Sequence, residues 1–211
     1  MKTKIFSSVV AFSVLFCGAA QASETIEVGL GATTLGTTVE GRYVLSDNFA
    51  LRGIYALGLS ESFKETENGV AYDITGNIGG FALLADYKPF GGGFVLGAGL
   101  FSSNTSIDLS ATVSNQDFGD STNVSGSLTG EAKFKNSTSP MVLLGYQGSI
   151  GSLNIRGDLG AMFTGGIDLS ASASSGSISQ ADIDKELAEV EKDASAINYF
   201  PFVGFTITYE F

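Results

Sequence analysis

The sequence predicts an all-β fold: an eight-stranded antiparallel transmembrane β-barrel with one short helix in an extracellular loop. Three observations lead to this prediction. The chain begins with the pattern of an export signal, many of its segments alternate between apolar and polar residues, and the last segment alternates up to the terminal Phe211. Alternation with a period of two predicts strands whose two faces meet different environments, and in an exported chain it is typical of outer-membrane barrels.

Residues 1–22 are predicted to be a signal peptide. Lys2 and Lys4 precede the apolar run 5–16, and the small residues Ala20 and Ala22 form a cleavage pattern. We expect cleavage after Ala22, which leaves 23–211 as a single outer-membrane β-barrel domain. The one cysteine, Cys17, would leave with the signal, so disulfides, thiolate metal sites and cysteine nucleophiles are not expected.

Charge and composition exclude several classes of function. The mature chain keeps nine basic and 22 acidic residues, a net charge of −13, which argues against nucleic-acid binding because phosphate recognition needs clustered Lys and Arg. Histidine is absent, so the usual general base of hydrolases and acyltransferases is missing. We therefore expect neither an enzyme nor a cofactor.

Eight strands are expected, at 25–32, 36–45, 49–60, 70–88, 93–109, 128–146, 152–165 and 197–211. In the last strand, Phe205, Ile207, Tyr209 and Phe211 share one face, which is expected to face lipid and to form the assembly signal of the barrel. Glu210 should point inward or to the periplasmic rim, and this strand should close against the one that begins near Thr25. A bulge is expected near Gly79-Gly80, where the alternation slips.

The connections between these strands alternate between short and long, as a barrel requires, except that the first outer loop, near Thr33-Thr34-Leu35, is tight. The segments 46–48, 89–92 and 148–151 are short, whereas 61–69, 110–127 and 166–196 are long and polar. Within the last of these, 179–196 is predicted to be helical, with a capping box at Ser179 and Asp182. Its apolar stripe is Ile183, Leu187, Val190 and Ala194. This stripe should pack over the barrel rim; the alternative is a lid or docking helix.

The charged residues opposite the apolar strand faces are expected to point into the lumen, because a basic residue facing lipid near the midplane costs roughly 2–4 kcal/mol. An eight-stranded barrel is just wide enough for side chains to fill, so charges of both signs predict a lumen plugged by ion pairs. A narrow pore lined by the same charges is the alternative. The predicted lumen charges are Glu40, Arg42, Arg52, Asp86, Lys88, Glu131, Lys133, Arg156 and Asp158.

Several segments together resemble a family of small, mostly uncharacterised proteobacterial outer-membrane β-barrel proteins. The resemblance rests on 84–94, on 97–101 with Asn104 and 107–109, on the acidic helix followed by Tyr199-Phe200-Pro201, and on the terminal Tyr209-Glu210-Phe211. More broadly, the chain looks like OmpA-type and opacity-type eight-stranded barrels. The resemblance implies a fold and an outer-membrane location, and it brings no catalytic residue or substrate.

Two functions remain open from the sequence. The first is a structural or surface-interaction barrel that presents acidic, Ser/Thr-rich loops. The second is a narrow gated channel or transporter for a small or apolar molecule, opened by movement of the 179–196 helix. The expected partners are outer-membrane lipid, lipopolysaccharide and, during insertion, the barrel-assembly machinery; the sequence does not identify an extracellular partner.

Overall fold

A computed structural model of the chain describes residues 25–67, 70–118, 121–194 and 198–211. The predicted signal peptide, 1–22, lies outside the described residues. The described part forms eleven strands and one helix, and all strand pairs are antiparallel.

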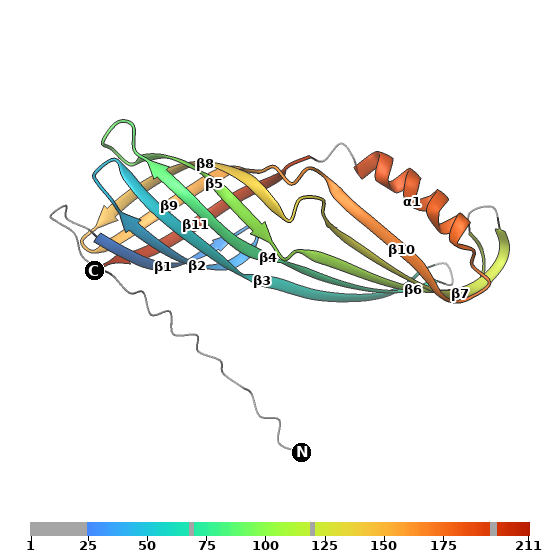
Figure 1. Cartoon of the computed structure of the whole chain (residues 1–211). Helices are drawn as coiled ribbons and strands as arrows, with labels where there is room; N and C mark the ends of the chain where they lie inside the picture. The colour runs from blue at the N-terminus through green and yellow to red at the C-terminus, as the bar shows by residue number, and fades with distance from the viewer. Residues whose placement is uncertain (1–24, 68–69, 119–120, 195–197) are drawn as a thin grey trace, which may run out of the picture.

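Eight of the strands close into a barrel (Figure 1), which confirms the predicted fold class. Each strand pairs with the next around the ring, and β1 pairs with β11 to close it, with Val28 opposite Tyr209. The predicted closure of the last strand on the first is therefore confirmed. The barrel strands are β1 (Thr25–Thr33), β2 (Gly36–Val44), β3 (Phe49–Glu67), β4 (Val70–Tyr87), β5 (Phe94–Ser103), β8 (Thr138–Ile150), β9 (Leu153–Met162) and β11 (Phe200–Glu210).

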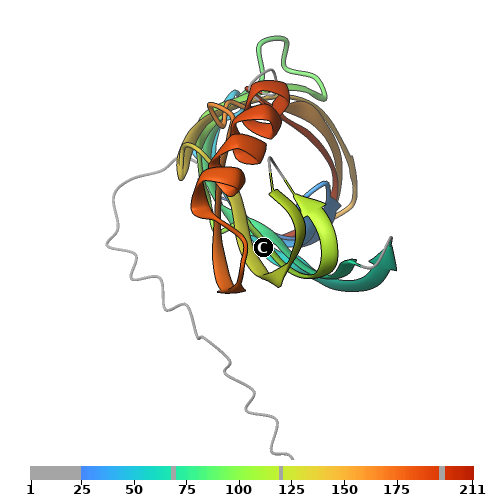
Figure 2. The same ribbon diagram turned by 90° about the vertical axis from the view of Figure 1, so that its right-hand side faces the viewer.

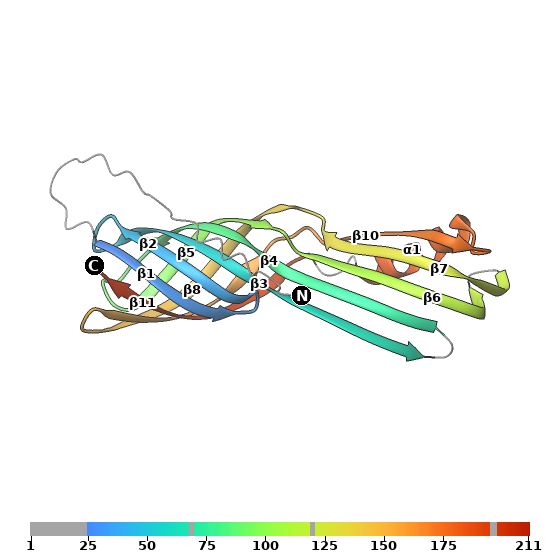
Figure 3. The same ribbon diagram turned by 90° about the horizontal axis from the view of Figure 1, so that it is seen from below.

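The remaining elements extend one side of the barrel beyond its rim (Figure 3). The distal half of β4 pairs with β6 (Ser106–Phe118), β6 pairs with β7 (Ser121–Phe134), and β7 pairs with β10 (Ile167–Gly176). The helix α1 (Gln180–Ala194) follows β10 and packs against it. We call β6, β7, β10, α1 and the distal parts of β3 (from Leu59) and β4 (up to Ile78) the extracellular lobe.

Several predicted strand boundaries are wrong because the sequence did not predict the lobe. The predicted strand 93–109 is divided into β5 and β6, and the predicted strand 128–146 into β7 and β8. The segments 61–69 and 110–127, predicted to be loops, consist mostly of strand, and 166–196 contains β10 as well as the predicted helix. Their Ser, Thr and acidic content suggested loops, yet apolar residues still alternate within them, as at Ala111 and Val113 and again at Ile167, Leu169 and Ala171.

The ends of the barrel differ as the sequence predicts. The short turns 45–48, 88–93 and 151–152 lie at the same end as Thr25 and Phe211, whereas the lobe lies at the opposite end (Figure 1). Outer-membrane barrels place short turns and both termini in the periplasm, which makes the lobe extracellular. The tight turn between β1 and β2 at the extracellular end buries the Leu35 side chain.

The chemical character of the two strand faces reverses where the strands leave the barrel. On β4 the outward residues are Leu83 and Phe81 within the barrel, then Thr75 and Asp73 in the lobe. The opposite face carries the buried Asp86 within the barrel and ends in Ile78, Ile74 and Val70. An apolar outer band that gives way to polar residues marks the edge of the hydrocarbon layer. The extracellular edge of this layer therefore lies between Phe81 and Asn77.

A β-bulge lies at this boundary, as predicted from the slip in alternation, but the one extra residue is on β3. The register shifts between Ala56 and Leu59, opposite Gly80 and Ile78. Gly58 has a φ of 88°, a conformation that other residues rarely adopt. The bulge moves Leu59 to the face opposite to Leu57, and so it begins the lobe.

The predicted capping box of the helix is present. The backbone N–H of Asp182 donates to Ser179 Oγ at 3.2 Å, and Ser179 Oγ donates to the Asp182 carboxylate at 2.7 Å. Ile183 is buried and Leu187 is partly buried against the lobe strands, whereas Val190 is exposed. The predicted stripe is therefore only partly a packing surface; the Ala194 side chain lies outside the described residues. No helix in the described ranges is long and apolar enough to cross a bilayer.

The orientation can be tested with single cysteines. Ser62→Cys lies on the polar face of the lobe and Gly92→Cys in a short turn with open space around it. On intact cells, a membrane-impermeant maleimide should label Ser62→Cys alone, and after outer-membrane permeabilisation it should label both. Labelling of Gly92→Cys alone on intact cells would show the reverse orientation.

Candidate functional site

The periplasmic half of the lumen is filled by a layer of charged side chains from five strands. Three arginines and four carboxylates are buried there, which confirms a lumen containing ion pairs. The members are Glu27 on β1, Glu40 and Arg42 on β2, Arg52 on β3, Asp86 on β4, and Arg156 and Asp158 on β9. Thr206 and Thr208 of β11 complete the layer. We call it the charged layer.

Asp86 is the centre of the charged layer because it contacts all three arginines. Arg52 approaches it from β3 with Nε 3.1 Å from Oδ2 and Nη2 3.1 Å from Oδ1. Arg156 donates from β9 through Nη1 at 2.8 Å and Nη2 at 3.3 Å, and Arg42 Nε lies 3.5 Å away. Paired guanidinium–carboxylate contacts are geometrically specific as well as strong, so Asp86 fixes three strands relative to β4.

The other three carboxylates bind the outer sides of the same arginines. Asp158 accepts from Arg52 Nη1 at 2.8 Å and from Arg156 Nε at 2.9 Å. Glu27 pairs with Arg42 Nη1 at 2.7 Å and also accepts from Thr208 Oγ1 at 2.9 Å. Glu40 lies 3.7 Å from Arg52 and accepts from Thr206 Oγ1 at 3.3 Å. The network thus links strands on opposite sides of the lumen.

Two glycines on the facing wall make room for these side chains. A Cβ at Gly145 would lie 2.6 Å from Asp158 Oδ1 and 3.0 Å from Arg156 Nη2, and one at Gly97 would lie 3.0 Å from Asp86 Oδ1. Contacts under 3.0 Å require the charged groups to move. Inward-facing glycines on β5 and β8, opposite charged strands, are a sequence signal for the position of the network that the prediction of the lumen charges did not use.

At the periplasmic mouth, the charged layer meets a recess lined by turn residues. Lys88, predicted to be a lumen charge, lies here at the end of β4 and is half-buried rather than within the charged layer. Partial burial lowers the pKa of the Lys88 ammonium, and the nearby Arg42 lowers it further. The recess is lined by Thr25, Glu27, Arg42, Val44, Asp47, Asn48, Lys88, Gly91, Gln147, Ser149, Asn154 and Glu210. Glu210 therefore lies at the periplasmic rim, one of the two predicted positions.

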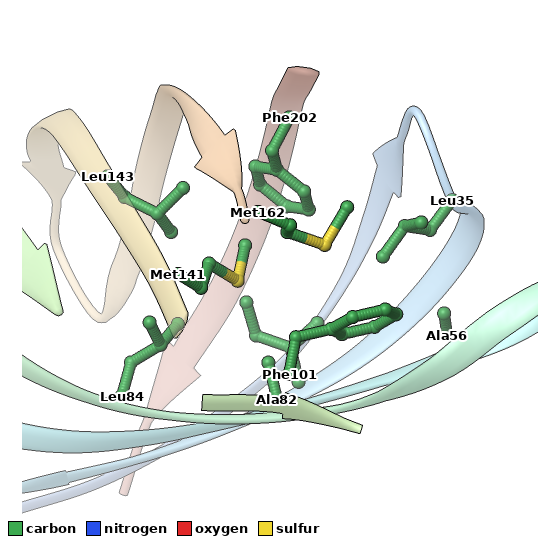
Figure 4. Packing of buried hydrophobic residues seen from close by; sticks show 10 residues of the cluster. Leu35, Ala56, Ala82, Leu84, Phe101, Met141, Leu143, Met162 and Phe202 are labelled. Carbon is green, nitrogen blue, oxygen red and sulfur yellow. The ribbon is translucent and has the colours of Figure 1, made fainter. Parts of the chain in front are cut away.

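The extracellular half of the lumen is filled by apolar side chains (Figure 4), which the sequence reading did not anticipate. Phe101, Met141, Met162 and Phe202 are each no more than 1% exposed and pack against one another with Leu35. The full set, which we call the apolar layer, is Leu35, Ile54, Ala56, Ala82, Leu84, Phe101, Met141, Leu143, Met162 and Phe202. No inward-facing apolar residue was predicted from the sequence, because only the charged residues were assigned to the lumen.

Glu131 and Lys133 were predicted to face the lumen, and this prediction is wrong. Both lie on β7 in the extracellular lobe, where Lys133 Nζ pairs with Glu131 Oε1 at 2.7 Å on the exposed face. That hydrogen bond raises the pKa of the Lys133 ammonium. Lys64 and Asp73 form a similar exposed pair at 2.6 Å, which raises the pKa of Lys64. Because the strands extend beyond the membrane here, charges can face outward without contacting lipid.

The predicted assembly-signal residues share the outer face of β11. Phe205, Ile207 and Tyr209 are about half exposed, Phe211 is 78% exposed, and the Tyr209 and Phe211 rings pack edge to face at 4.9 Å. Their neighbours Thr206 and Thr208 point into the lumen. This arrangement fits the predicted lipid-facing surface, and recognition of it by an assembly machinery stays a prediction.

The closed ring, the apolar exterior and the buried charged layer place the chain in the class of eight-stranded outer-membrane β-barrels. Two solved structures share this fold: CarO of Acinetobacter baumannii, with a TM-score of 0.57 over 88% of this chain and 97% of that one, and CarO2 of the same organism, with 0.60 over 89% and 98%. Each is 18% identical to this chain, so the likeness concerns the fold. No family model matches the sequence, and no curated protein matches it.

Within the part of the chain that the structure describes, no group of three or more His, Cys, Asp or Glu side chains is arranged to hold a metal ion. Each of the four carboxylates of the charged layer instead lies within 4 Å of one of its three arginines.

Removal of Asp86 should destabilise the barrel strongly. Asp86→Asn leaves three buried guanidinium groups short of a charge partner, and breaking a buried ion pair costs roughly 3–5 kcal/mol. Asp73→Asn removes a carboxylate from an exposed pair and should cost about 1 kcal/mol or less. Urea unfolding of the refolded proteins in lipid vesicles measures both; equal losses would contradict the central role of Asp86.

The space at Gly145 gives a second test of the charged layer. Gly145→Ala should lower the free energy of unfolding by roughly 1–3 kcal/mol, because its Cβ overlaps the Asp158 carboxylate. Gly148→Ala, three residues along the same strand, meets no atom within 4 Å and is the matched control. A destabilisation at Gly148→Ala as large as at Gly145→Ala would attribute the effect to strand glycines in general.

Proposed function

We propose that this protein is a non-catalytic outer-membrane barrel whose closed lumen serves as a rigid anchor, and whose extracellular lobe is the surface that interacts with other molecules. The observation that carries the proposal is the pair of buried layers, one charged and one apolar, which fill successive halves of the lumen.

The charged layer favours the function of an anchor rather than that of a channel. A solute that passed it would have to separate Asp86 from arginines on three other strands. An uncompensated buried charge costs several kcal/mol, and these arginines would have to be displaced together.

The apolar layer adds a second barrier of a different kind. A hydrated or charged solute would lose its water among Phe101, Met141 and Phe202, which carry no polar group to replace it. A molecule suited to one layer is therefore unsuited to the other, which disfavours a narrow gated channel for either polar or apolar cargo.

The distribution of charge supports a surface role for the lobe. The segments 59–78, 104–137 and 163–199 contain 15 acidic and five basic residues, a net −10 of the −13 carried by the mature chain. The strands of the lobe do not require such charge for folding, since exposed acidic residues contribute little to stability. A strongly acidic surface attracts cationic partners and repels anionic ones.

Conductance of the refolded protein in planar bilayers tests the anchor directly. We expect no stepwise current and no uptake of small sugars in liposome-swelling assays. A variant with the apolar layer reduced, Phe101→Ala with Phe202→Ala, should also stay closed because the charged layer is intact. Reproducible current through the unmodified protein that disappears in a bulkier-lumen variant, such as Gly97→Leu, would overturn the proposal.

A further inference from the structure

The lobe presents an apolar face that only part of the protein covers. This face continues the inner wall of the barrel: Ile78 packs against the apolar layer, and Ile74, Tyr72 and Val70 follow it on the same side of β4. Leu59 and Phe63 lie beside it on β3, paired with Ile78 and Ile74. The other strands add Ile107, Leu109, Ala111 and Val113 on β6, Leu128, Ala132 and Phe134 on β7, and Ile167, Leu169 and Ala171 on β10.

The helix α1 covers the distal end of this face. Ile183 and Leu187 pack against Val70, Val113 and Leu128, all of which belong to it. Figure 2 looks along the molecule from the lobe and shows the strands as a curved wall with α1 lying against part of it. The protein itself thus demonstrates that the face accepts an amphipathic helix.

The proximal part of the face, between α1 and the barrel rim, stays uncovered. Phe63 is 63% exposed there, Leu59 45%, Ile107 42% and Ile74 37%. From Leu59 to Phe63 the strand runs roughly 13 Å, and five strands span roughly 19 Å. Three turns of helix are about 16 Å long and 10 Å wide, so one further helix that crosses the strands fits on the uncovered area.

The charges around the uncovered area favour a cationic occupant. In the described parts of the five lobe strands, no Lys or Arg lies on the apolar face; Lys64 and Lys133 are both on the opposite face, in their exposed ion pairs. The exposed Glu61 lies between Leu59 and Phe63 on the apolar face. The α1 segment 180–194 contains six acidic and two basic residues.

The same charges argue against two other occupants. A second copy of this chain would bring another lobe of net charge −10, and anionic lipid headgroups would also be repelled. We propose that the uncovered apolar face binds a cationic amphipathic peptide segment as a short helix beside α1. This inference rests on the proposed function, since it names the class of partner for the lobe.

The binding mode is helix-in-groove recognition. The apolar stripe of the peptide would contact Ile74, Phe63 and Ile107, while its Lys and Arg side chains would flank the stripe and face Glu61 and α1. Removal of apolar area from water supplies the affinity, and the charges select the sign of the partner and speed its association.

A designed Leu/Lys helical peptide of 14 residues is a suitable probe. Its fluorescence anisotropy is measured with the refolded chain in nanodiscs of zwitterionic lipid, after subtraction of empty nanodiscs. We expect saturable binding that weakens with added salt. A Leu/Glu peptide of the same pattern, and the Leu/Lys composition in scrambled order, should bind at least roughly tenfold more weakly, because each lacks one of the two complementary features.

Matched variants locate the site. Glu61→Lys and Asp73→Lys change the charge of the lobe equally, but Glu61 lies on the apolar face and Asp73 on the opposite one. Glu61→Lys and the double variant Phe63→Ser with Ile74→Ser should weaken binding by roughly tenfold or more, whereas Asp73→Lys should change it less than twofold. All four positions are exposed or half-exposed, so these variants should still fold. A difference in gel mobility between heated and unheated samples checks that their barrels are folded.

Three results would overturn the inference: no binding to folded, non-conducting protein, equal binding of the scrambled peptide, or equal weakening by Glu61→Lys and Asp73→Lys. The last two would indicate attraction to a generally acidic lobe without a defined site. Each leaves the closed anchor intact, whereas ionic current through the unmodified barrel would overturn the proposed function itself.

Discussion

The position of Asp86 at the centre of the lumen is the constraint on which the barrel depends. Three guanidinium groups from β2, β3 and β9 converge on one carboxylate from β4, so these strands are held across the lumen as well as around the ring. A register slip of one residue in any of them would turn its charge toward lipid. The network therefore specifies register, whatever it contributes to net stability, which for buried ion pairs is often small.

The reversal of the strand faces at the membrane boundary separates the two parts of the molecule. Within the bilayer, apolar residues face outward because lipid surrounds the barrel, and charges are paired inside. Beyond the bulge at Gly58, water surrounds the strands, and the polar face that includes Lys64, Asp73 and Lys133 is the outer one. Apolar residues then gather on the inner side, where α1 covers some of them. The same alternation of apolar and polar residues thus suits the lipid around the barrel and the water around the lobe.

The same reversal explains what the sequence could and could not predict. Alternation and connection lengths predicted the eight-stranded ring, its closure and six of the seven charged members of the charged layer, because a charged residue within the bilayer must face the lumen. They misplaced Glu131 and Lys133, since alternation alone does not show where a strand leaves the membrane. They also missed the apolar layer: Phe101 and Phe202 occupy inward positions, but an apolar residue is acceptable on either face, and only tertiary packing decides.

The division of the lumen into charged and apolar layers is consistent with the demands of export. A strand that is apolar on both faces approaches the hydropathy of a membrane-spanning helix, and a long run of that kind would be retained in the inner membrane. In β4 the residues 81–85 are apolar on both faces, and Asp86 ends the run after five residues. In β2, β3, β4 and β9, buried charges keep the segment polar while the chain is unfolded, and they become paired only when Asp86 meets the arginines. The filled lumen therefore follows from the requirements of export. The lobe is not subject to this requirement and can take on a specific role.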